Sequence, residues 1–338
     1  MRKTLLPLVV LFLFATGYSK HSLFIPLTGG YHVKKDPALK PLIFAENIIS
    51  TEDDEFGATF TPDEKTCYFT MKSPSTIVSN IIVICFSSFK NGQWSAPEIA
   101  PFSGRYQDFN PCISPDGLRL FFISNRPVDG KQKLDYDIWM AEKSGEGWSE
   151  PKNIGEPVNT KGWELGCSVA SNGTLYFSTT GISGNPDLYK SKLVNGKYQE
   201  PESLGEAINT VYGETDPFIA PDESYILFAS QGRPDGLGEA GASVSYPRGD
   251  LYISFYKEGK WTPSKNLGPS VNSTAEESNP WVSHDGKTLY YTSERNFVSI
   301  PMKQQLNYSS LEEHLHNPGN GLGDIYEVPV SIFMKDFH

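Results

Sequence analysis

Residues 114–122, SPDGLRLFF, decide the fold, because they join a tight turn to an aromatic strand and the same pattern returns along the chain. Proline and Asp-Gly supply the backbone angles of a turn between two strands. Similar turns stand at residues 61–64 (TPDE), 170–173 (ASNG), 220–223 (APDE) and 283–286 (SHDG). Self-similarity at a regular period is the signature of a repeat architecture, so we expect the chain to be built from repeated units.

Further landmarks come after each turn. A third strand opens with Asp, then Ile or Leu, then an aromatic residue in four copies, and the first copy has Val83 at the equivalent place. An aromatic residue eleven positions after this place begins a fourth strand. An Asn or Ser marker stands eleven residues before each turn. The third-strand acids are Asp137, Asp187, Asp250 and Asp324; the fourth-strand aromatics are Trp94, Trp148, Tyr198 and Trp261; the markers are Ser50, Ser103, Asn159, Asn209 and Asn272. Each copy is therefore four antiparallel strands in about 50–63 residues, the size of a propeller blade.

The ends of the repeat predict how the ring closes. The chain holds five turns and five third strands, but only four complete fourth strands, and the last copy stops after Asp324. Residues 41–50 stand where a fourth strand would precede the first turn, and a ring closed by them leaves no open sheet edge. We therefore predict an all-β chain forming a single β-propeller domain over residues 41–338, with five four-stranded blades closed by an N-terminal strand. Six blades is the alternative, if residues 19–40 conceal degenerate strands.

The Pro-Asp-Gly, Asp-Ile-Tyr and Asn-Leu-Gly motifs together resemble the TolB-like, WD40-like β-propeller repeat of exported bacterial proteins. The resemblance covers about residues 41–330. It implies a propeller with functions that range from protein-complex scaffolding to envelope binding, and some related propeller families are polysaccharide lyases. A shared fold leaves the function open.

The N-terminus has the features of an export signal. Arg2 and Lys3 precede an apolar run over residues 5–14 and a small-residue exit over residues 15–19. The run is shorter than the roughly 18–20 apolar residues of a membrane span. We expect residues 1–19 to be a cleaved signal peptide, residues 20–40 to be poorly ordered, and the mature protein to be periplasmic or secreted with no membrane span. A net charge of −11 argues against a nucleic-acid partner.

Four cysteines, Cys67, Cys85, Cys112 and Cys167, fall in predicted strands. Their spacing matches no disulfide or zinc framework. Cys67 and Cys85, on neighbouring strands of one repeat, are the only pair that this pattern favours for a disulfide. Small buried apolar side chains are the preferred interpretation for all four.

Strand order assigns two faces to the propeller. The Pro-Asp turns lie on one face, here called the bottom; the start of strand one, the end of strand two and the start of strand three lie on the other, the top. An acid stands five residues after each marker, and a cation ends strand two in most copies. We expect Arg126 to pair with Asp137 and Arg233 with Asp250. The five acids, predicted to ring the channel mouth on the top face, are Glu55, Asp108, Glu164, Glu214 and Glu277.

Aromatic residues on the crossovers before these acids add to the predicted site. They are Tyr106, Trp163 and Tyr212, and two long inserts, residues 231–249 and 294–323, lie on the same face and carry Tyr246, Arg248, Phe297, Tyr308, His314 and His316. Aromatic faces with carboxylates suit sugar rings or a basic peptide. We predict a non-catalytic binding or scaffolding propeller with a glycan or a protein or peptide ligand at the channel mouth, and with no metal or cofactor. The alternative is a carbohydrate-active hydrolase or lyase that uses the top-face carboxylates.

Overall fold

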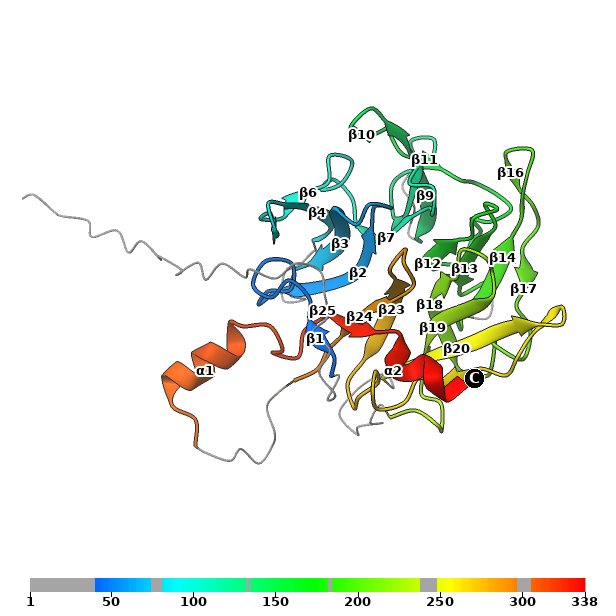
Figure 1. Cartoon of the computed structure of the whole chain (residues 1–338). Helices are drawn as coiled ribbons and strands as arrows, with labels where there is room; N and C mark the ends of the chain where they lie inside the picture. The colour runs from blue at the N-terminus through cyan, green and yellow to red at the C-terminus, as the bar shows by residue number, and fades with distance from the viewer. Residues whose placement is uncertain are drawn as a thin grey trace, which may run out of the picture.

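Five antiparallel β-sheets are arranged around a common centre in the computed structural model, which describes residues 40–73, 81–131, 133, 135–181, 184–237, 248–296 and 305–337 (Figure 1). The chain is a five-bladed β-propeller, as predicted from the repeat. Residues 1–39, which include the predicted signal peptide and the segment considered for a sixth blade, lie outside the described residues.

Each of the first four blades takes its strands from one copy of the repeat. Blade one holds β2 (Asp54–Phe60), β3 (Thr66–Lys72), β4 (Ile82–Lys90), β5 (Gln93–Trp94) and β6 (Glu98–Ile99). Blade two holds β7 (Asp108–Ile113), β8 (Arg119–Ser124), β9 (Asp137–Ser144), β10 (Gly147–Trp148) and β11 (Lys152–Asn153). Blade three holds β12 (Glu164–Val169), β13 (Leu175–Thr179), β14 (Asp187–Ser191) and β17 (Glu202–Ser203), with β15 (Leu193–Val194) and β16 (Lys197–Tyr198) as a small hairpin.

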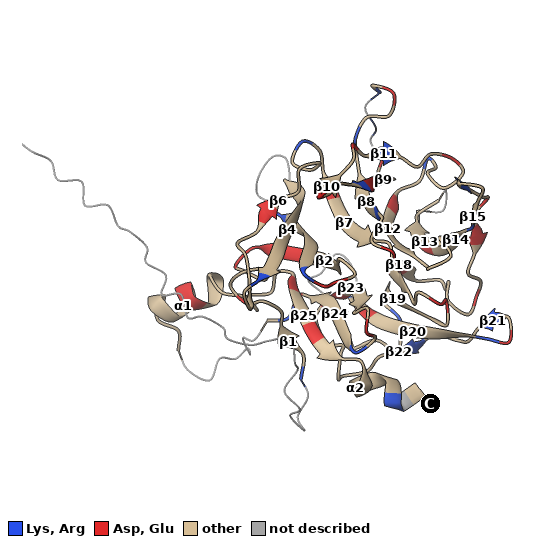
Figure 2. Cartoon of the chain, turned by 45° about the horizontal axis from the view of Figure 1, so that its top comes forward, with Lys and Arg blue, Asp and Glu red and all other residues tan. Residues whose placement is uncertain are grey.

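Blade four holds β18 (Gly213–Ile219), β19 (Tyr225–Gln231), β20 (Gly249–Lys257), β21 (Lys260–Trp261) and β22 (Lys265–Asn266). Blade five holds β23 (Glu277–Val282), β24 (Thr288–Ser293), β25 (Asp324–Pro329) and β1 (Leu42–Ile43). Helix α1 (Tyr308–Leu315) lies in the blade-five insert, and helices α2 (Ser331–Met334) and η1 (Lys335–Phe337) come after the last strand. The inner strands β2, β7, β12, β18 and β23 gather around the centre of the molecule (Figure 2).

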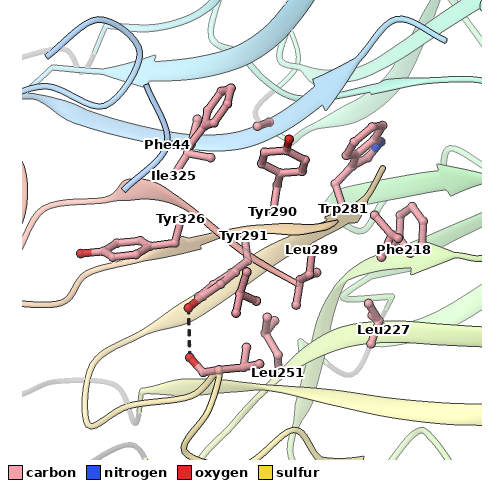
Figure 3. Packing of buried hydrophobic residues seen from close by; sticks show 14 of the residues in the cluster. Phe44, Phe218, Leu227, Leu251, Trp281, Leu289, Tyr290, Tyr291, Ile325 and Tyr326 are labelled. Carbon is pink, nitrogen blue, oxygen red and sulfur yellow. Dashed lines mark hydrogen bonds between the residues drawn. The ribbon is translucent and has the colours of Figure 1, made fainter. Parts of the chain in front are cut away.

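The N-terminal strand closes the ring, as predicted. Leu42 pairs with Glu327 and Ile43 with Tyr326 in the β1–β25 ladder, and the Phe44 N–H donates to the Ile325 carbonyl at 2.7 Å. Phe44 then inserts between blades, with its ring 5.1 Å from that of Tyr290 and 5.6 Å from that of Phe60. Figure 3 shows Phe44 beside Ile325 and Tyr290 in the cluster that also receives side chains from blade four.

The fourth strand is shorter than the sequence pattern indicated. The aromatic residue predicted to begin it instead ends a small hairpin with strand three, as Trp94 does opposite Phe89. The strand then breaks and resumes as a second two-residue piece, such as β6 or β11. A proline stands in each break, as Pro97 and Pro151 do, and proline cannot donate to a sheet ladder.

The markers fasten each crossover to the blade before it. The Asn159 amide accepts from the Ile138 N–H at 3.0 Å and donates to the Ile138 carbonyl at 2.9 Å, so the side chain replaces a strand partner. The same pair of bonds joins Asn209 to Leu188, Asn272 to Leu251 and Ser50 to Ile325. The recurrence of these residues in the sequence is therefore architectural.

Candidate functional site

The five acids predicted to ring the channel mouth are fully buried, each with 0 % of its surface exposed. Each one accepts a hydrogen bond from a hydroxyl four or five residues earlier on its own crossover, as Glu55 does from Thr51 Oγ1 at 2.5 Å. The donors to the other four, Asp108, Glu164, Glu214 and Glu277, are Ser103, Thr160, Thr210 and Ser273. Their carboxylates are turned into their own blades, and a ligand role for them stays a prediction.

Two of these acids are paired with arginines, and here the expected pairing was wrong. Arg126 contacts Asp108 at 3.0 Å rather than Asp137, and Arg295 contacts Glu277 at 3.3 Å. Asp137 is held instead by Lys133 at 2.5 Å and by the Asn153 amide at 2.7 Å. In blade four, likewise, Arg233 pairs with Asp235 at 3.4 Å, and Asp250 accepts from Asn266 at 2.7 Å.

The remaining three acids, Glu55, Glu164 and Glu214, form no ion pair with any residue that the structure describes. Burial raises the pKa of Glu55 to about 8 and that of Glu164 to about 7, and it also raises the pKa of Glu214. One oxygen of Glu164, Oε2, is buried with no hydrogen-bond partner among the described residues. Glu164 is therefore the least satisfied member of the set.

A polar plug closes the channel, and the repeat pattern did not predict it. The inner strands β7, β18 and β23 each have a bulge that begins two residues after the acid, where Asn110, Asp216 and Asn279 adopt φ values of 50°, 51° and 49°. Their side chains meet: Asn110 Nδ2 donates to Asp216 Oδ1 at 3.1 Å, and Asn279 Nδ2 donates to Asn110 Oδ1 at 3.0 Å. The matching positions of blades one and three are Gly57 and Gly166, where a Cβ would lie 2.8 Å from Asn110 Oδ1 and 2.9 Å from Asp216 Oδ1.

Two signals in the sequence could have revealed this plug. Asn-Pro or Asp-Pro stands two residues after the acid in three copies, at residues 110–111, 216–217 and 279–280, and Gly replaces Asn or Asp in the other two. Asn and Asp tolerate left-handed backbone angles better than most residues do, and bulges are frequent next to functional sites.

Below the plug lies a small cavity. It measures about 40 Å³ and is lined by the bulge residues and those that come after them, including Pro111, Pro217 and Trp281. A water molecule occupies about 30 Å³ of liquid, whereas ligand pockets usually measure about 300–1,000 Å³. A sugar or a peptide is therefore too large for this cavity.

On the top face, the structure brings together three aromatic side chains from blades two and three. The Trp163 ring lies 5.5 Å from that of Tyr136 at a near-perpendicular angle of 85°, and Tyr136 lies 5.1 Å from Phe109. The Tyr136 hydroxyl donates to Gln107 Oε1 at 2.5 Å, which fixes the orientation of the ring. Trp163 is 47 % exposed, although a large aromatic side chain usually buries most of its surface. We call Trp163, Tyr136 and Phe109 the aromatic platform.

The other two predicted aromatics lie elsewhere on the rim. Tyr106 is half-buried under Arg126, whose guanidinium carbon is 5.7 Å from the centre of the tyrosine ring. Tyr212 is half-buried on the crossover before β18, where its N–H donates to Thr210 Oγ1 at 3.1 Å. Of the three, only Trp163 is exposed rather than half-buried.

The two inserts are described in part. Arg248 contacts Glu294 at 3.9 Å, whereas Tyr246 and Phe297 lie outside the described residues. Helix α1 is capped at its N-terminus by Asn307, whose side chain accepts from the Ser310 N–H, and the helix stands clear of the blades (Figure 1). His316, just after the helix, contacts Glu52 at 2.6 Å and so ties the insert to the crossover before β2.

Comparison with known proteins finds similarity in solved structures. A protein described as "putative TolB" from Agrobacterium tumefaciens is 14 % identical over 82 % of this chain and 90 % of its own, with a TM-score of 0.45. A protein of unknown function from Dyadobacter fermentans is 11 % identical over 87 % and 99 %, with a TM-score of 0.48. The catalytic domain of a GH62 α-L-arabinofuranosidase from Coprinopsis cinerea is 10 % identical over 86 % and 96 %, with a TM-score of 0.48. These similarities concern the fold alone.

No protein-family model matches the sequence, and a search of curated proteins finds no match. The strand topology defines a five-bladed β-propeller, and its repeat motifs resemble those of TolB-like proteins. None of the helices in the described part of the chain is long and apolar enough to cross a membrane.

Proposed function

We propose that this protein is an exported binding propeller that holds a glycan on the top face, with Trp163 as the principal contact. The observation that carries the proposal is the exposed Trp163 ring, supported from the side by Tyr136 at 5.5 Å. An indole held edge-to-face by a second aromatic offers a rigid apolar surface at little cost in conformational entropy. Such a surface stacks well against the C–H face of a sugar ring.

Polar groups beside the platform support a sugar more than an apolar ligand. Gln107 carries an amide that already bonds to Tyr136 and to Asn125, whose Nδ2 donates to Gln107 Oε1 at 3.2 Å. Small numbers of oriented polar groups around an apolar surface give a ligand site its specificity. A peptide with an aromatic or prolyl side chain is the competing ligand class, and the binding experiment includes it.

The burial of the ring acids favours binding over hydrolysis. A glycosidase needs two carboxyl groups about 5–10 Å apart that reach the scissile bond. The five acids have no exposed surface and are hydrogen-bonded within their own blades. In this arrangement the acids stabilise the crossovers through these hydrogen bonds, and the exposed Trp163 side chain remains available to contact a ligand.

Isothermal titration of the purified protein against neutral oligosaccharides, peptidoglycan fragments and proline-rich peptides tests the proposal. Replacing Trp163 with Ala should weaken glycan binding at least tenfold, because truncating a central aromatic anchor costs about 2 kcal/mol or more. Leu118→Ala is the matched control, since Leu118 is 57 % exposed on a bottom-face turn. Equal affinity in Trp163→Ala and wild type, or peptide binding alone, would count against a glycan site at Trp163.

One observation supports the hydrolase alternative and makes it testable. Glu164 directly follows Trp163, its pKa lies at about 7, and one of its oxygens lacks a partner among the described residues. A carboxyl group with a pKa near 7 can act as a general acid. If the protein is an enzyme, Glu164→Gln should abolish turnover of an oligosaccharide; the binding proposal expects no turnover in wild type and unchanged affinity in the variant.

A further inference from the structure

Blade two carries a distinctive pair of residues just after its bottom-face turn. Leu118 and Arg119 are the fifth and sixth residues counted from Ser114. The same two places hold Lys65-Thr66 in blade one, Ser224-Tyr225 in blade four and Lys287-Thr288 in blade five. Of these four blades, only blade two therefore combines an apolar residue with an arginine. Binding sites arise at such local departures from a shared fold.

This pair lines a depression in the surface of blade two. The depression measures about 410 Å³ and is lined by Asp116, Leu118, Arg119, Glu142 and Lys143. Small-molecule sites usually measure about 300–1,000 Å³. The backbone of Leu118 is held on both sides, because its N–H donates to Asp116 Oδ1 at 3.0 Å and its carbonyl accepts from the Lys143 N–H at 2.8 Å. Its side chain is nevertheless 57 % exposed, so the depression presents a well-positioned apolar group to solvent.

Arg119 is a largely buried cation whose guanidinium donates no hydrogen bond to any residue in the described part of the chain. Its side chain is 22 % exposed, and the contact of Nη2 with Asp116 Oδ2, at 3.8 Å, is too long for a hydrogen bond. The other oxygen of Asp116 already accepts from Ser114 Oγ and from the Leu118 N–H. A guanidinium carries five N–H donors in a fork that matches a carboxylate. Arg119 therefore has donors available for a carboxylate ligand.

A carboxylate stands opposite this arginine. Glu142 on β9 is the cross-strand partner of Arg119 on β8, and directly opposite residues have Cβ atoms about 4.5–5.5 Å apart. Glu142 instead pairs with Lys152 at 3.9 Å, and its side chain is 58 % exposed. The charges that line the depression balance, with Arg119 and Lys143 against Asp116 and Glu142. An anion alone would meet two acids and a cation alone would meet two bases, so the lining favours a ligand with both charges.

We propose that this depression binds a small zwitterion with an apolar side chain, either a free amino acid or a dipeptide. The carboxylate of the ligand pairs with Arg119, its ammonium group pairs with Glu142, and its side chain packs against Leu118. The two charge-assisted contacts orient the ligand, and the apolar contact selects its side chain. The depression lies beside the bottom-face turn, at the opposite end of the inner strands from Trp163, so this proposal is independent of the glycan proposal.

Saturation-transfer NMR and isothermal titration of the full-length protein with leucine-based probes test the proposal. L-Leucine and leucyl-leucine carry both charges, whereas N-acetyl-leucine lacks the ammonium group and leucinamide lacks the carboxylate. We expect each blocked compound to bind about tenfold or more weakly than the better of the two zwitterions, because one charged contact is lost. L-Alanine should also bind more weakly than L-leucine. The comparison of L-leucine with leucyl-leucine distinguishes the free amino acid from the dipeptide.

Variants then locate the site. Arg119→Met and Glu142→Gln should each weaken binding of the better zwitterion about tenfold. Glu142→Gln should keep the Tm of wild type, because the side chain is exposed, and this separates lost binding from lost folding. Leu118→Ala should weaken zwitterion binding several-fold and leave glycan binding unchanged, and Trp163→Ala should do the reverse. Lys287→Met is the matched control, because Lys287 takes the place of Leu118 in the blade-five turn and is 79 % exposed.

Four results would overturn the proposal. One is the absence of saturation transfer to both zwitterions at millimolar concentration. Another is a blocked compound that binds as tightly as the zwitterions. A third is wild-type affinity in both Arg119→Met and Glu142→Gln. The last is loss of zwitterion binding in Trp163→Ala, which would place this ligand on the top face.

Discussion

At the scale of single residues, the charged groups of the top face stabilise the blades that carry them. Asp108 has no exposed surface, and its two oxygens accept from Arg126, Ser103 and Ser124. Arg126 also lies 4.8 Å above the Phe122 ring and donates to the Phe102 carbonyl at 2.5 Å. Removing one partner of a buried ion pair lowers the stability strongly, because the remaining charge is left unpaired away from water.

Replacing Arg126 with Met should therefore lower the free energy of unfolding by about 3–5 kcal/mol. Lys152→Met is the control, because Lys152 and its partner Glu142 have side chains that are 70 % and 58 % exposed, and an exposed pair contributes about 1 kcal/mol or less. Urea denaturation followed by tryptophan fluorescence measures both variants. Similar losses in the two variants would show that the Arg126–Asp108 pair has no special structural role.

At the scale of secondary-structure elements, the closing strand is short but well anchored. β1 contributes only two residues to the ladder, so its hold on blade five depends on the side chains of residues 44–49. Phe44 is 4 % exposed and packs against Phe60, Trp94 and Tyr290. Ile49, further along the same segment, is completely buried. The segment therefore closes the ring through side-chain packing more than through strand pairing.

Shortening the Phe44 side chain should weaken the closure of the ring. Phe44→Ala should lower the free energy of unfolding by about 3–5 kcal/mol, the usual cost of removing a buried phenylalanine side chain. Leu42→Ala, in the same strand but 57 % exposed, should change it by less than about 0.5 kcal/mol. Deleting residues 20–50 should expose the edge of β25 and cause aggregation. A deletion variant that melts like the full chain would contradict closure by this segment.

At the scale of the whole molecule, buried carboxyl groups make stability depend on pH. Burial raises the pKa of Glu55 to about 8, those of Glu164, Asp324 and Glu327 to about 7, and that of Asp216 to about 6. In the unfolded chain these groups titrate near pH 4. The folded protein therefore holds protons that the unfolded chain releases, so stability falls as the pH rises from about 4.5 to 8.

Thermal melts between about pH 2.5 and 8.5 should accordingly give the highest Tm near pH 4. Below that pH the Tm should fall, because the turn acids Asp63, Asp116, Asp222 and Asp285 have lowered pKa values and lose their hydrogen bonds when protonated. Glu327→Gln should raise the Tm at pH 8 and flatten the profile, whereas a change at exposed Glu98 should leave both unaltered. A Tm that stays constant or rises between pH 5 and 8 would refute the assignment.

The spacing of turns and aromatic strands predicted the blades and their closure, because strand pairing follows a local pattern that repeats. This spacing did not predict which acid each arginine pairs with. Ser124 lies between Asp108 on one neighbouring strand and Asp137 on the other, so strand order places Arg126 near both. Arg126 pairs with Asp108 because Asp137 is already paired with Lys133, at 2.5 Å. The plug of Asn110, Asp216 and Asn279 was missed for a related reason: contacts across the axis join residues far apart in sequence.

A structure of the protein with a bound oligosaccharide tests the central claim, ligand binding on the top face, most directly. The account predicts a sugar ring stacked on the exposed face of Trp163, with Gln107 or Asn125 within hydrogen-bonding distance of its hydroxyl groups. It also predicts that the channel below Asn110, Asp216 and Asn279 holds no part of the ligand. A sugar that instead contacts the Pro-Asp turns, such as the one at Asp116, would place the binding site on the bottom face and contradict the account.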